Sequence, residues 1–267
     1  MSESPLPISL TIAGSDSGGG AGIQADLKTF HAFGTFGTSV ITAITAQNTM
    51  EVTAVHPVPL EVVRAQIDAV ATDLRPGGVK SGMLATASLV GTVADALEAH
   101  GLEAYVLDPV MVAASGARLL DEDAVETLAR RLVPLSALVT PNLDEARILT
   151  GLPVEDEEGQ KEAARKLVEM GAGAALVKGG HGTGPEVVDI LWNGREERIW
   201  RRPRLETRST HGTGCTLSAA VAAGLSRGES LQDAVDRALG FVARAMASAP
   251  GLGRGHGPLN HFAPVRD

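Results

Sequence analysis

The chain has 267 residues, of which 44% are hydrophobic but only 3% are aromatic. This length allows one large domain or two small ones, and an interior built from Ala, Val, Leu and Gly favours α/β layers over an aromatic-rich β sandwich. The formal net charge of −9, without any basic run, argues against a nucleic-acid-binding protein.

The sequence also bears on the compartment. A single cysteine, Cys215, excludes a disulfide framework within the chain and indicates a reducing environment. Residues 1–7 have no basic region followed by a long apolar core, so we predict no signal peptide. No apolar run approaches the roughly 18–20 residues of a membrane span. We therefore expect a cytoplasmic protein that binds neither nucleic acid nor membrane.

Strand and helix patterns alternate along the chain. Apolar or β-branched runs bounded by Gly, Pro or amide residues predict strands, and apolar residues at helical spacing predict helices. The expected strands cover residues 8–13, 40–46, 51–56, 79–84, 105–111, 138–140 and 174–178. The expected helices cover residues 23–33, 59–75, 86–100, 121–132, 144–150, 161–170, 214–224 and 231–248.

One late segment has a different pattern. Asn193 and Gly194 separate β-type runs over residues 187–192 and 196–202, which predicts a β-hairpin. Elsewhere the alternation predicts βαβ units, and no linker or repeat divides the chain. We predict a single domain over residues 1–267, a doubly wound α/β fold with a mostly parallel central sheet and helices on both faces. Ligands of such sheets bind beyond the carboxyl ends of the strands.

A glycine-rich stretch over residues 210–216, Thr-His-Gly-Thr-Gly-Cys-Thr, precedes the small apolar helix. The first amides of such a helix have no partners within it and lie at the positive end of its dipole, so they can bind phosphate. Cys215 falls in the first turn, where we expect a lowered thiol pKa. We predict an anion hole at Gly212 and Gly214 around Cys215. The alternative is a tight loop with a buried cysteine.

The segment after the first strand is also glycine-rich. Gly20, Gly22 and Ala25 match the looser form of the dinucleotide-binding fingerprint. The second strand should then end in an acidic residue for the ribose, but the amide residue Gln47 follows it. An NAD-binding oxidoreductase is therefore only an alternative. The P-loop pattern is absent, so any nucleoside triphosphate must bind through another design.

Gln47 and Met83 are candidates for binding a ring. A primary amide both donates and accepts hydrogen bonds, as reading the edge of a pyrimidine requires. A methionine can cover an aromatic ring, although core packing is its more common role. A simple turn at the strand end is the alternative for Gln47.

Charged and amide side chains follow three further strands. Asp108 can hold Mg²⁺ through water, and Asn142 and Glu145 are spaced to share one helix face. Asn142 alternatively only caps that helix. Lys178 places a cation beside glycines, where a ligand can approach the backbone. Because these strand ends meet at one edge of the sheet, the cluster predicts a Mg²⁺–phosphate site.

Together these stretches resemble the bacterial hydroxymethylpyrimidine/phosphomethylpyrimidine kinases of thiamine biosynthesis, in the ribokinase-like superfamily. The resemblance extends from residue 10 to residue 262. It is carried by residues 11–16, 19–29, 45–49, 80–84, 107–111, 140–146, 178–181 and 210–216. Ser17 and Gly18 stand where members often have Pro-Ser, and Ser81 stands where Ile is common. These departures leave the assignment standing.

The resemblance implies a ribokinase-like fold, ATP with Mg²⁺, and a homodimer. It implies two phosphoryl transfers, first to the hydroxymethyl oxygen of 4-amino-5-hydroxymethyl-2-methylpyrimidine and then to the monophosphate. Four residues would bind the substrate: Gly14, Asp26, Gln47 and Met83. Three would bind ATP: Asn142, Lys178 and Thr210. Asp108 and Glu145 would hold Mg²⁺ through water, and Cys215 would act in catalysis with the anion hole of Gly212 and Gly214.

Relatives across the superfamily generally have aspartate as the base where this chain has Cys215. Because a triphosphate would repel a permanent thiolate, we expect a partly deprotonated thiol or one that takes the proton late. Its contribution would be about 10²-fold or somewhat more. A pyridoxal or pyridoxine kinase is the nearest alternative, since its substrates are also small rings with a hydroxymethyl group. A catalytically silent ligand-binding protein is another, which replacing Cys215 would leave unaffected.

Overall fold

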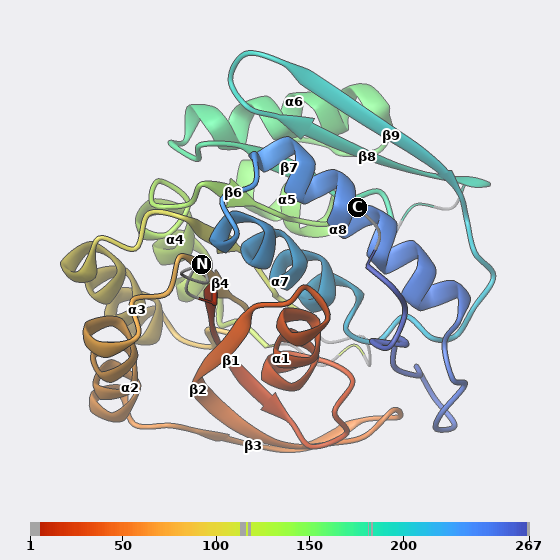
Figure 1. Cartoon of the computed structure of the whole chain (residues 1–267). Coiled ribbons are helices and arrows are strands. Elements are labelled where there is room, and N and C mark those ends of the chain that lie inside the picture. Colours follow the sequence, from red (N-terminus) through yellow and green to blue (C-terminus); the bar gives the residue numbers. More distant parts are fainter. Residues whose placement is uncertain (1–5, 113–115, 117–118, 181, 183, 266–267) are drawn as a thin grey trace, which may run out of the picture.

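The computed structural model describes residues 6–112, 116, 119–180, 182 and 184–265. A nine-stranded sheet forms the centre of this part of the chain. Its strand order is β3-β2-β1-β4-β5-β6-β7-β8-β9 (Figure 1). The strands are β1 (Ile8–Asp16), β2 (Phe36–Gln47), β3 (Val52–Pro57), β4 (Gly78–Ser81), β5 (Tyr105–Leu107), β6 (Leu138–Val139), β7 (Ala175–Val177), β8 (Glu186–Trp192) and β9 (Glu197–Pro203).

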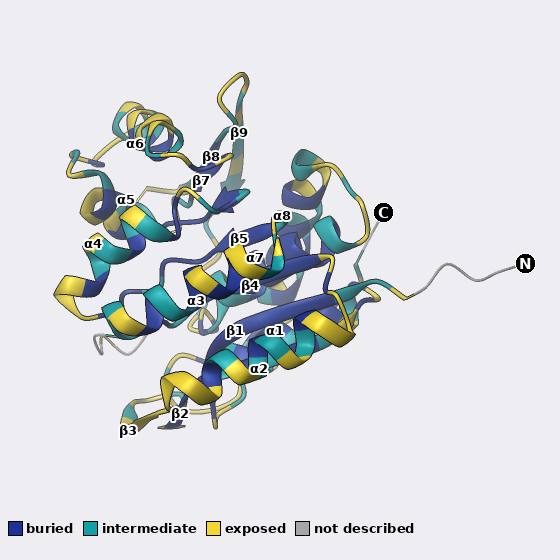
Figure 2. Cartoon of the chain, turned by 90° about the vertical axis from the view of Figure 1, so that its left-hand side faces the viewer, coloured by how far each residue is buried: buried dark blue, intermediate teal, exposed yellow. Residues whose placement is uncertain are grey.

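Helices cover both faces of this sheet, whose central strands are buried between them (Figure 2). They are α1 (Gly22–Ala32), α2 (Leu60–Asp73), α3 (Ala87–His100), α4 (Glu122–Arg131), α5 (Leu143–Thr150), α6 (Glu157–Glu169), α7 (Thr213–Ser226) and α8 (Leu231–Ala247). Helices α2 to α6 pack in one core with sheet residues such as Leu107. Helices α1, α7 and α8 pack in the other core with sheet residues such as Val106. Successive residues of β5 thus face opposite layers, as strand geometry requires.

The prediction of a doubly wound, mostly parallel sheet is confirmed. Strand β1 pairs in parallel with both β2 and β4, and the parallel series continues through β5, β6 and β7. The predicted late hairpin is formed by β8 and β9, with β8 antiparallel to β7. A second antiparallel pair, which the sequence pattern does not reveal, joins β3 to β2 at the opposite edge of the sheet.

Several strand ends differ from the predicted ranges, and those of β1 and β5 bear most on the site. Strand β1 continues beyond residue 13, and its last residue, Asp16, pairs with Thr45 of β2. Strand β5 ends at Leu107 instead of residue 111, since Pro109 has no amide hydrogen to donate to a neighbouring strand. Asp108 therefore lies in the loop directly beyond the carboxyl edge of the sheet.

The alanine-rich helix α7 packs very close to the sheet. Residues 216–224 are all buried, and a Cβ atom at Gly78 of β4 would overlap the carbonyl oxygen of Ala222. Small residues therefore build this core, in accord with the low aromatic content. The same packing brings the N-terminus of α7 to the carboxyl edge, where a Cβ atom on Gly214 would lie 3.4 Å from the Asp108 carboxylate.

Local signals in the sequence account for several helix ends. Ser230 caps α8 by accepting a hydrogen bond from the amide of Asp233. Gly101 ends α3 in the left-handed conformation, with φ of 61°. Asn142 caps α5. None of the helices in the described ranges is both long and apolar enough to cross a membrane.

Candidate active site

A cavity of about 520 Å³ opens at the carboxyl edge of the sheet. It brings together residues from the ends of six parallel strands and from the N-terminus of α7. Every predicted site residue except Asp26 lines it: Gly14, Gln47, Met83, Asp108, Asn142, Glu145, Lys178, Thr210, Gly212, Gly214 and Cys215. Thr210 is exposed at the rim, where its carbonyl oxygen accepts a hydrogen bond from the Thr213 hydroxyl at 2.6 Å.

The start of α7 has the geometry of an anion hole. Gly212 precedes the helix with φ of 79°, and a Cβ atom there would overlap the carbonyl oxygen of Gly20. Glycine is therefore required at this position. Among the described residues, none accepts a hydrogen bond from the backbone amides of Gly214 and Cys215. These two amides line the cavity and are available to an anionic ligand.

An ion pair lies next to these amides. The Lys178 Nζ atom is 3.1 Å from the carboxylate of Asp108. The hydroxyls of Thr140 and Ser218 also lie 3.4 Å from this carboxylate. Although burial opposes it, the charge of Asp108 raises the pKa of Lys178, and the charge of Glu145 raises it further. The cavity thus contains a fixed cation that stays charged at neutral pH.

Asn142 and Glu145 form a reciprocal cap at the start of α5. The Asn142 side chain accepts a hydrogen bond from the Glu145 amide at 2.9 Å, and the Glu145 carboxylate accepts one from the Asn142 amide at 2.8 Å. Asn142 therefore caps the helix, which was the alternative to a role in the site, but both Asn142 and Glu145 also line the cavity. Burial and the nearby charge of Asp108 raise the pKa of Glu145 to about 7.

Cys215 lies in the first turn of α7, as predicted, but its ionisation differs from the prediction. Burial raises the pKa of the thiol to about 11, and the carboxylates of Asp26 and Asp108 also raise it. The charge of Lys80 opposes this shift more than either carboxylate adds to it, and a hydrogen bond from the Gly22 backbone opposes it slightly. The expectation of a lowered pKa is therefore wrong, because desolvation outweighs both the charge of Lys80 and the position at the helix terminus. The thiol is neutral at pH 7.

At the opposite end of the cavity, the uncharged side chains of Gln47 and Met83 lie near Asp16 and His211, which also line it. Gln47, at the end of β2, accepts a hydrogen bond from the Thr45 hydroxyl at 3.3 Å. The backbone carbonyl of Met83 accepts a hydrogen bond from the Thr42 hydroxyl at 2.9 Å. A Cβ atom at Gly14 would lie 3.1 Å from the Met83 sulfur. The Gln47 amide and the Met83 thioether therefore line the cavity next to Gly14, which has no side chain. This arrangement leaves room for a flat ring.

Asp26, which we expected beside the substrate, is instead fully buried and does not line the cavity. Its carboxylate lies 2.9 Å from Lys80 Nζ and accepts a 2.6 Å hydrogen bond from the Thr11 hydroxyl. Lys80 is also fully buried, and Asp26 raises its pKa although burial opposes this. A lysine inside an apolar strand is the sequence signal for such a pair, because a buried charge requires a partner.

Asp16 and His211 form a hydrogen-bonded pair that the sequence analysis missed. The His211 Nε2 atom lies 2.9 Å from the Asp16 carboxylate. Asp16 also accepts hydrogen bonds from the amides of Gly20 and Ala21 at 3.0 and 2.8 Å. Although burial opposes it, the pKa of Asp16 is lowered, most by the hydrogen bond with His211 and further by the backbone amides of Ala21 and Gly18. The pair ties the β1–α1 loop to the loop that precedes the anion hole.

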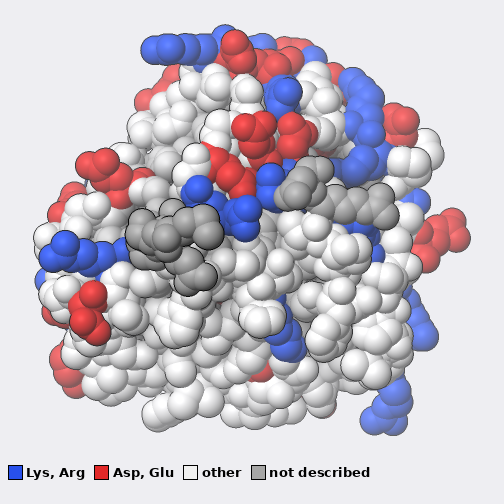
Figure 3. All heavy atoms as spheres, in the orientation of Figure 1, with Lys and Arg blue, Asp and Glu red and all other residues white. Residues whose placement is uncertain are grey.

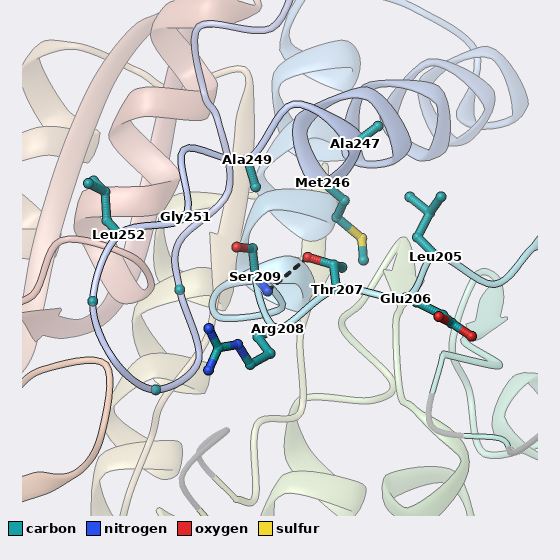
Figure 4. A pocket seen from close by; sticks show the side chains of 13 residues that line it. Leu205, Glu206, Thr207, Arg208, Ser209, Met246, Ala247, Ala249, Gly251 and Leu252 are labelled. Carbon is teal, nitrogen blue, oxygen red and sulfur yellow. Dashed lines mark hydrogen bonds between the residues drawn. The ribbon is translucent and has the colours of Figure 1, made fainter.

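A second cavity, of about 740 Å³, lies beside the anion-hole loop (Figure 4). Residues 205–209 and the C-terminal end of α8 form its walls, with apolar side chains from Leu205 and Met246. Gly257 also lines this cavity, and its carbonyl oxygen accepts a hydrogen bond from the His211 amide at 3.1 Å. The two cavities are thus separated by the loop that leads into α7. Nothing in the sequence pattern indicates this second cavity.

Comparison with known proteins identifies the family. The sequence matches the phosphomethylpyrimidine kinase family model over residues 16–260. The chain belongs to this family. A hydroxymethylpyrimidine/phosphomethylpyrimidine kinase of Bacillus subtilis is 48% identical over 261 residues, which cover 97% of this chain and 96% of that protein.

Solved structures agree with this assignment. The crystal structure of a phosphomethylpyrimidine kinase from Clostridium difficile is 40% identical, with a TM-score of 0.81 over 90% of this chain and 99% of that one. A pyridoxal kinase from Bacillus subtilis, in an ADP complex, is 34% identical, with a TM-score of 0.90 over 97% of this chain and 98% of that one. The predicted kinase family and ribokinase-like fold are confirmed, and the basis for an NAD-binding oxidoreductase is removed.

Proposed function

We propose that the protein transfers the γ-phosphoryl group of ATP to the hydroxymethyl oxygen of 4-amino-5-hydroxymethyl-2-methylpyrimidine. In a second reaction it transfers another γ-phosphoryl group to the monophosphate, which gives the diphosphate used in thiamine biosynthesis. One structural observation supports this proposal independently of the family assignment. A single cavity joins an amide that can read a pyrimidine edge, on Gln47, to an anion hole that is flanked by Lys178 and Asp108.

The pyrimidine would lie at the end of the cavity that holds Gln47 and Met83. Gln47 would read the ring nitrogen and the amino group, since its amide offers both a donor and an acceptor. Met83 would cover one face of the ring. The bare backbone at Gly14 would allow the ring to approach the sheet edge, where any side chain would first meet the Met83 sulfur.

The nucleotide would span the two cavities. Lys178, Asn142 and the free amides of Gly214 and Cys215 would hold the triphosphate. The nucleoside would occupy the second cavity, whose apolar side chains Leu205 and Met246 suit a purine (Figure 4). Thr210 lies at the rim of the first cavity, on the path between them.

Asp108 and Glu145 suit Mg²⁺ that is held through water. The described residues contain no cluster of three or more His, Cys, Asp or Glu side chains that could hold a metal ion. An ion here would therefore take most of its ligands from water and phosphate oxygens, as Mg²⁺ usually does. When bound, it would neutralise part of the charge of the triphosphate.

In each transfer the acceptor oxygen forms a bond to the γ-phosphorus while the bond to the β–γ bridging oxygen breaks, and ADP leaves with that electron pair. Lys178 and the amides of Gly214 and Cys215 would stabilise the charge on the transferred group. The neutral Cys215 would orient the hydroxymethyl group instead of removing its proton. That proton would move to an oxygen of the transferred phosphoryl group.

A neutral group at position 215 also suits the second transfer. The acceptor is then a phosphate oxygen, which carries negative charge and has no proton that a base must remove. A carboxylate or a thiolate at Cys215 would repel this acceptor. The raised thiol pKa of about 11 thus supports a site that serves both acceptors.

An ADP-release assay with three acceptors tests the proposal. We expect turnover of hydroxymethylpyrimidine and of its monophosphate, with a lower kcat/KM for pyridoxal. Sequence identity supports this order, since the pyrimidine kinases above reach 40% and 48% and the pyridoxal kinase 34%. Turnover of pyridoxal alone would favour the pyridoxal kinase alternative. No turnover with any acceptor would favour a silent binding protein.

We propose that the enzyme is a homodimer that uses the β2–β3 edge. Ile44, Met50 and Val55 are exposed apolar residues there, and few charged side chains cover β1 to β3 in the lower part of Figure 3. Light scattering should give twice the monomer mass of 27.5 kDa, and Val55→Lys should give the monomer.

We also place the enzyme in the cytoplasm, because it depends on ATP, and treat residues 1–267 as one kinase domain.

A further inference from the structure

The glycine-rich segment 252–258 contacts the turn of the β2–β3 hairpin. The His256 amide donates a hydrogen bond to the backbone carbonyl of Thr49 at 2.9 Å. The Gly255 amide donates one to the Thr49 hydroxyl at 3.3 Å. Thr49 lies two residues after Gln47, which lines the first cavity. The segment is thus bonded to the hairpin that carries the proposed ring-reading amide.

The same segment also contacts the loop that leads to the anion hole. Gly257 donates a hydrogen bond to the carbonyl of Arg208 and accepts one from the amide of His211, both at 3.1 Å. The His256 Nδ1 atom lies 3.3 Å from the Thr210 hydroxyl. Gly255 and Gly257 line the second cavity. The segment therefore joins the hairpin, the anion-hole loop and the second cavity.

The contact with Thr49 leaves no room for a side chain at position 255. A Cβ atom on Gly255 would overlap the backbone carbonyl oxygen of Thr49 and would lie 3.0 Å from the Met50 sulfur. The backbone of Gly255 is outside the left-handed region, so alanine could adopt its conformation. The requirement for glycine arises from the closeness of Thr49, and Gly255→Ala would open this contact specifically.

We propose that Gly255 and Thr49 are positioning residues that make the binding of nucleotide and of pyrimidine mutually dependent. A nucleoside in the second cavity would stabilise these contacts of the segment 252–258, which in turn would hold the hairpin and Gln47 over the ring. By thermodynamic reciprocity the bound pyrimidine would favour the nucleotide equally. This inference rests on the proposed function, which places the nucleoside in the second cavity.

Calorimetric titration of hydroxymethylpyrimidine tests the coupling, with and without a saturating non-hydrolysable ATP analogue and Mg²⁺. In the wild-type protein we expect the pyrimidine to bind about ten-fold more tightly when the analogue is present, a typical size for coupling between sites. In Gly255→Ala we expect this factor to fall to nearly one. Binding of the pyrimidine alone should change by less than about two-fold, because Gln47 is intact in that variant.

Two further variants keep this test decisive. Gly91→Ala is the matched control, because a Cβ atom there meets nothing within 4 Å, and it should keep the full coupling. Thr49→Val removes the hydroxyl but keeps the carbonyl, and it should lose part of the coupling even if Gly255→Ala proves unstable. Full coupling in Thr49→Val and in a folded Gly255→Ala would overturn the inference. So would wild-type protein that binds both ligands without coupling, whereas wild-type protein that binds neither would refute the proposed function itself.

Discussion

The two ends of the active-site cavity differ in charge and in the way their side chains are held. At the end where we place the pyrimidine ring (the ring end), Gln47 and Met83 are uncharged and come from an edge hairpin and a loop. At the end where we place the phosphates (the phosphate end), Lys178, Asp108 and Glu145 are ionisable, largely buried and held beyond central strands. Charged side chains also gather over α6, β8 and β9 in Figure 3. The difference suggests that the ring end sets affinity and the phosphate end sets rate, because transition-state stabilisation needs charges that are already in place.

Lys178→Met should give the largest loss. It removes the cation at the phosphate end and leaves the ring end intact. We expect kcat to fall by about 10²–10³-fold, as for the loss of one preorganised donor to the transition state. The KM for hydroxymethylpyrimidine should stay within about two-fold. Steady-state kinetics measure both, and a variant that changes mainly the pyrimidine KM would reverse the assignment of the two ends.

Gln47→Ala should act on the opposite end. We expect the KM for hydroxymethylpyrimidine to rise by roughly 10- to 100-fold, since one or two hydrogen bonds to the ring are lost. The KM for ATP should not change. Product formation at varied concentrations of each substrate separates the two effects, and Gln47→Glu serves as the size-matched control. An unchanged pyrimidine KM would show that Gln47 is only a turn residue.

Cys215 lies where the two ends meet. Cys215→Ala should lower kcat by about ten-fold, the value of one lost orienting contact, with a smaller change in the KM for ATP. Cys215→Asp should retain the first transfer but slow the second by about ten-fold or more, because like charges repel. Between pH 7 and 9 the wild-type kcat should stay nearly constant. A ten-fold rise per pH unit would instead identify the thiolate as the active form.

Glu145 should give the smallest effect, which depends on pH. With its pKa raised to about 7 by burial, the carboxyl group loses its proton as pH rises from 6 to 8. If the ionised form holds Mg²⁺ through water, kcat/KM for ATP should rise by roughly five-fold over this range. Glu145→Gln should flatten this part of the profile, while ATP titrates equally in both proteins. Identical profiles would exclude a role for Glu145.

The sequence predicts the fold well because its signals are local. Alternating apolar patterns and residues such as Gly101 and Asn142 define helices and strands without tertiary information. The carboxyl ends of parallel strands share one edge, so Asp108 and Lys178 are brought together by topology alone. The β2–β3 pair escapes prediction, because the short turn around Thr49 has no strong hairpin signal.

Other features depend on contacts between distant segments. Lys80 and Asp26 are separated by 54 positions and pair inside the protein, which places Asp26 outside the lining of the cavity. The pKa of Cys215 depends on burial and on charges that other elements supply. A helix N-terminus alone therefore predicts the wrong direction. Such properties need the packed structure, since sequence position does not fix desolvation.

Mass spectrometry of the products formed from hydroxymethylpyrimidine and excess ATP tests the central claim most directly. We predict a monophosphate that appears first and a diphosphate that replaces it, with two ADP released for each diphosphate. ADP release without a phosphorylated pyrimidine, or phosphorylation of pyridoxal only, would contradict this account of the cavity.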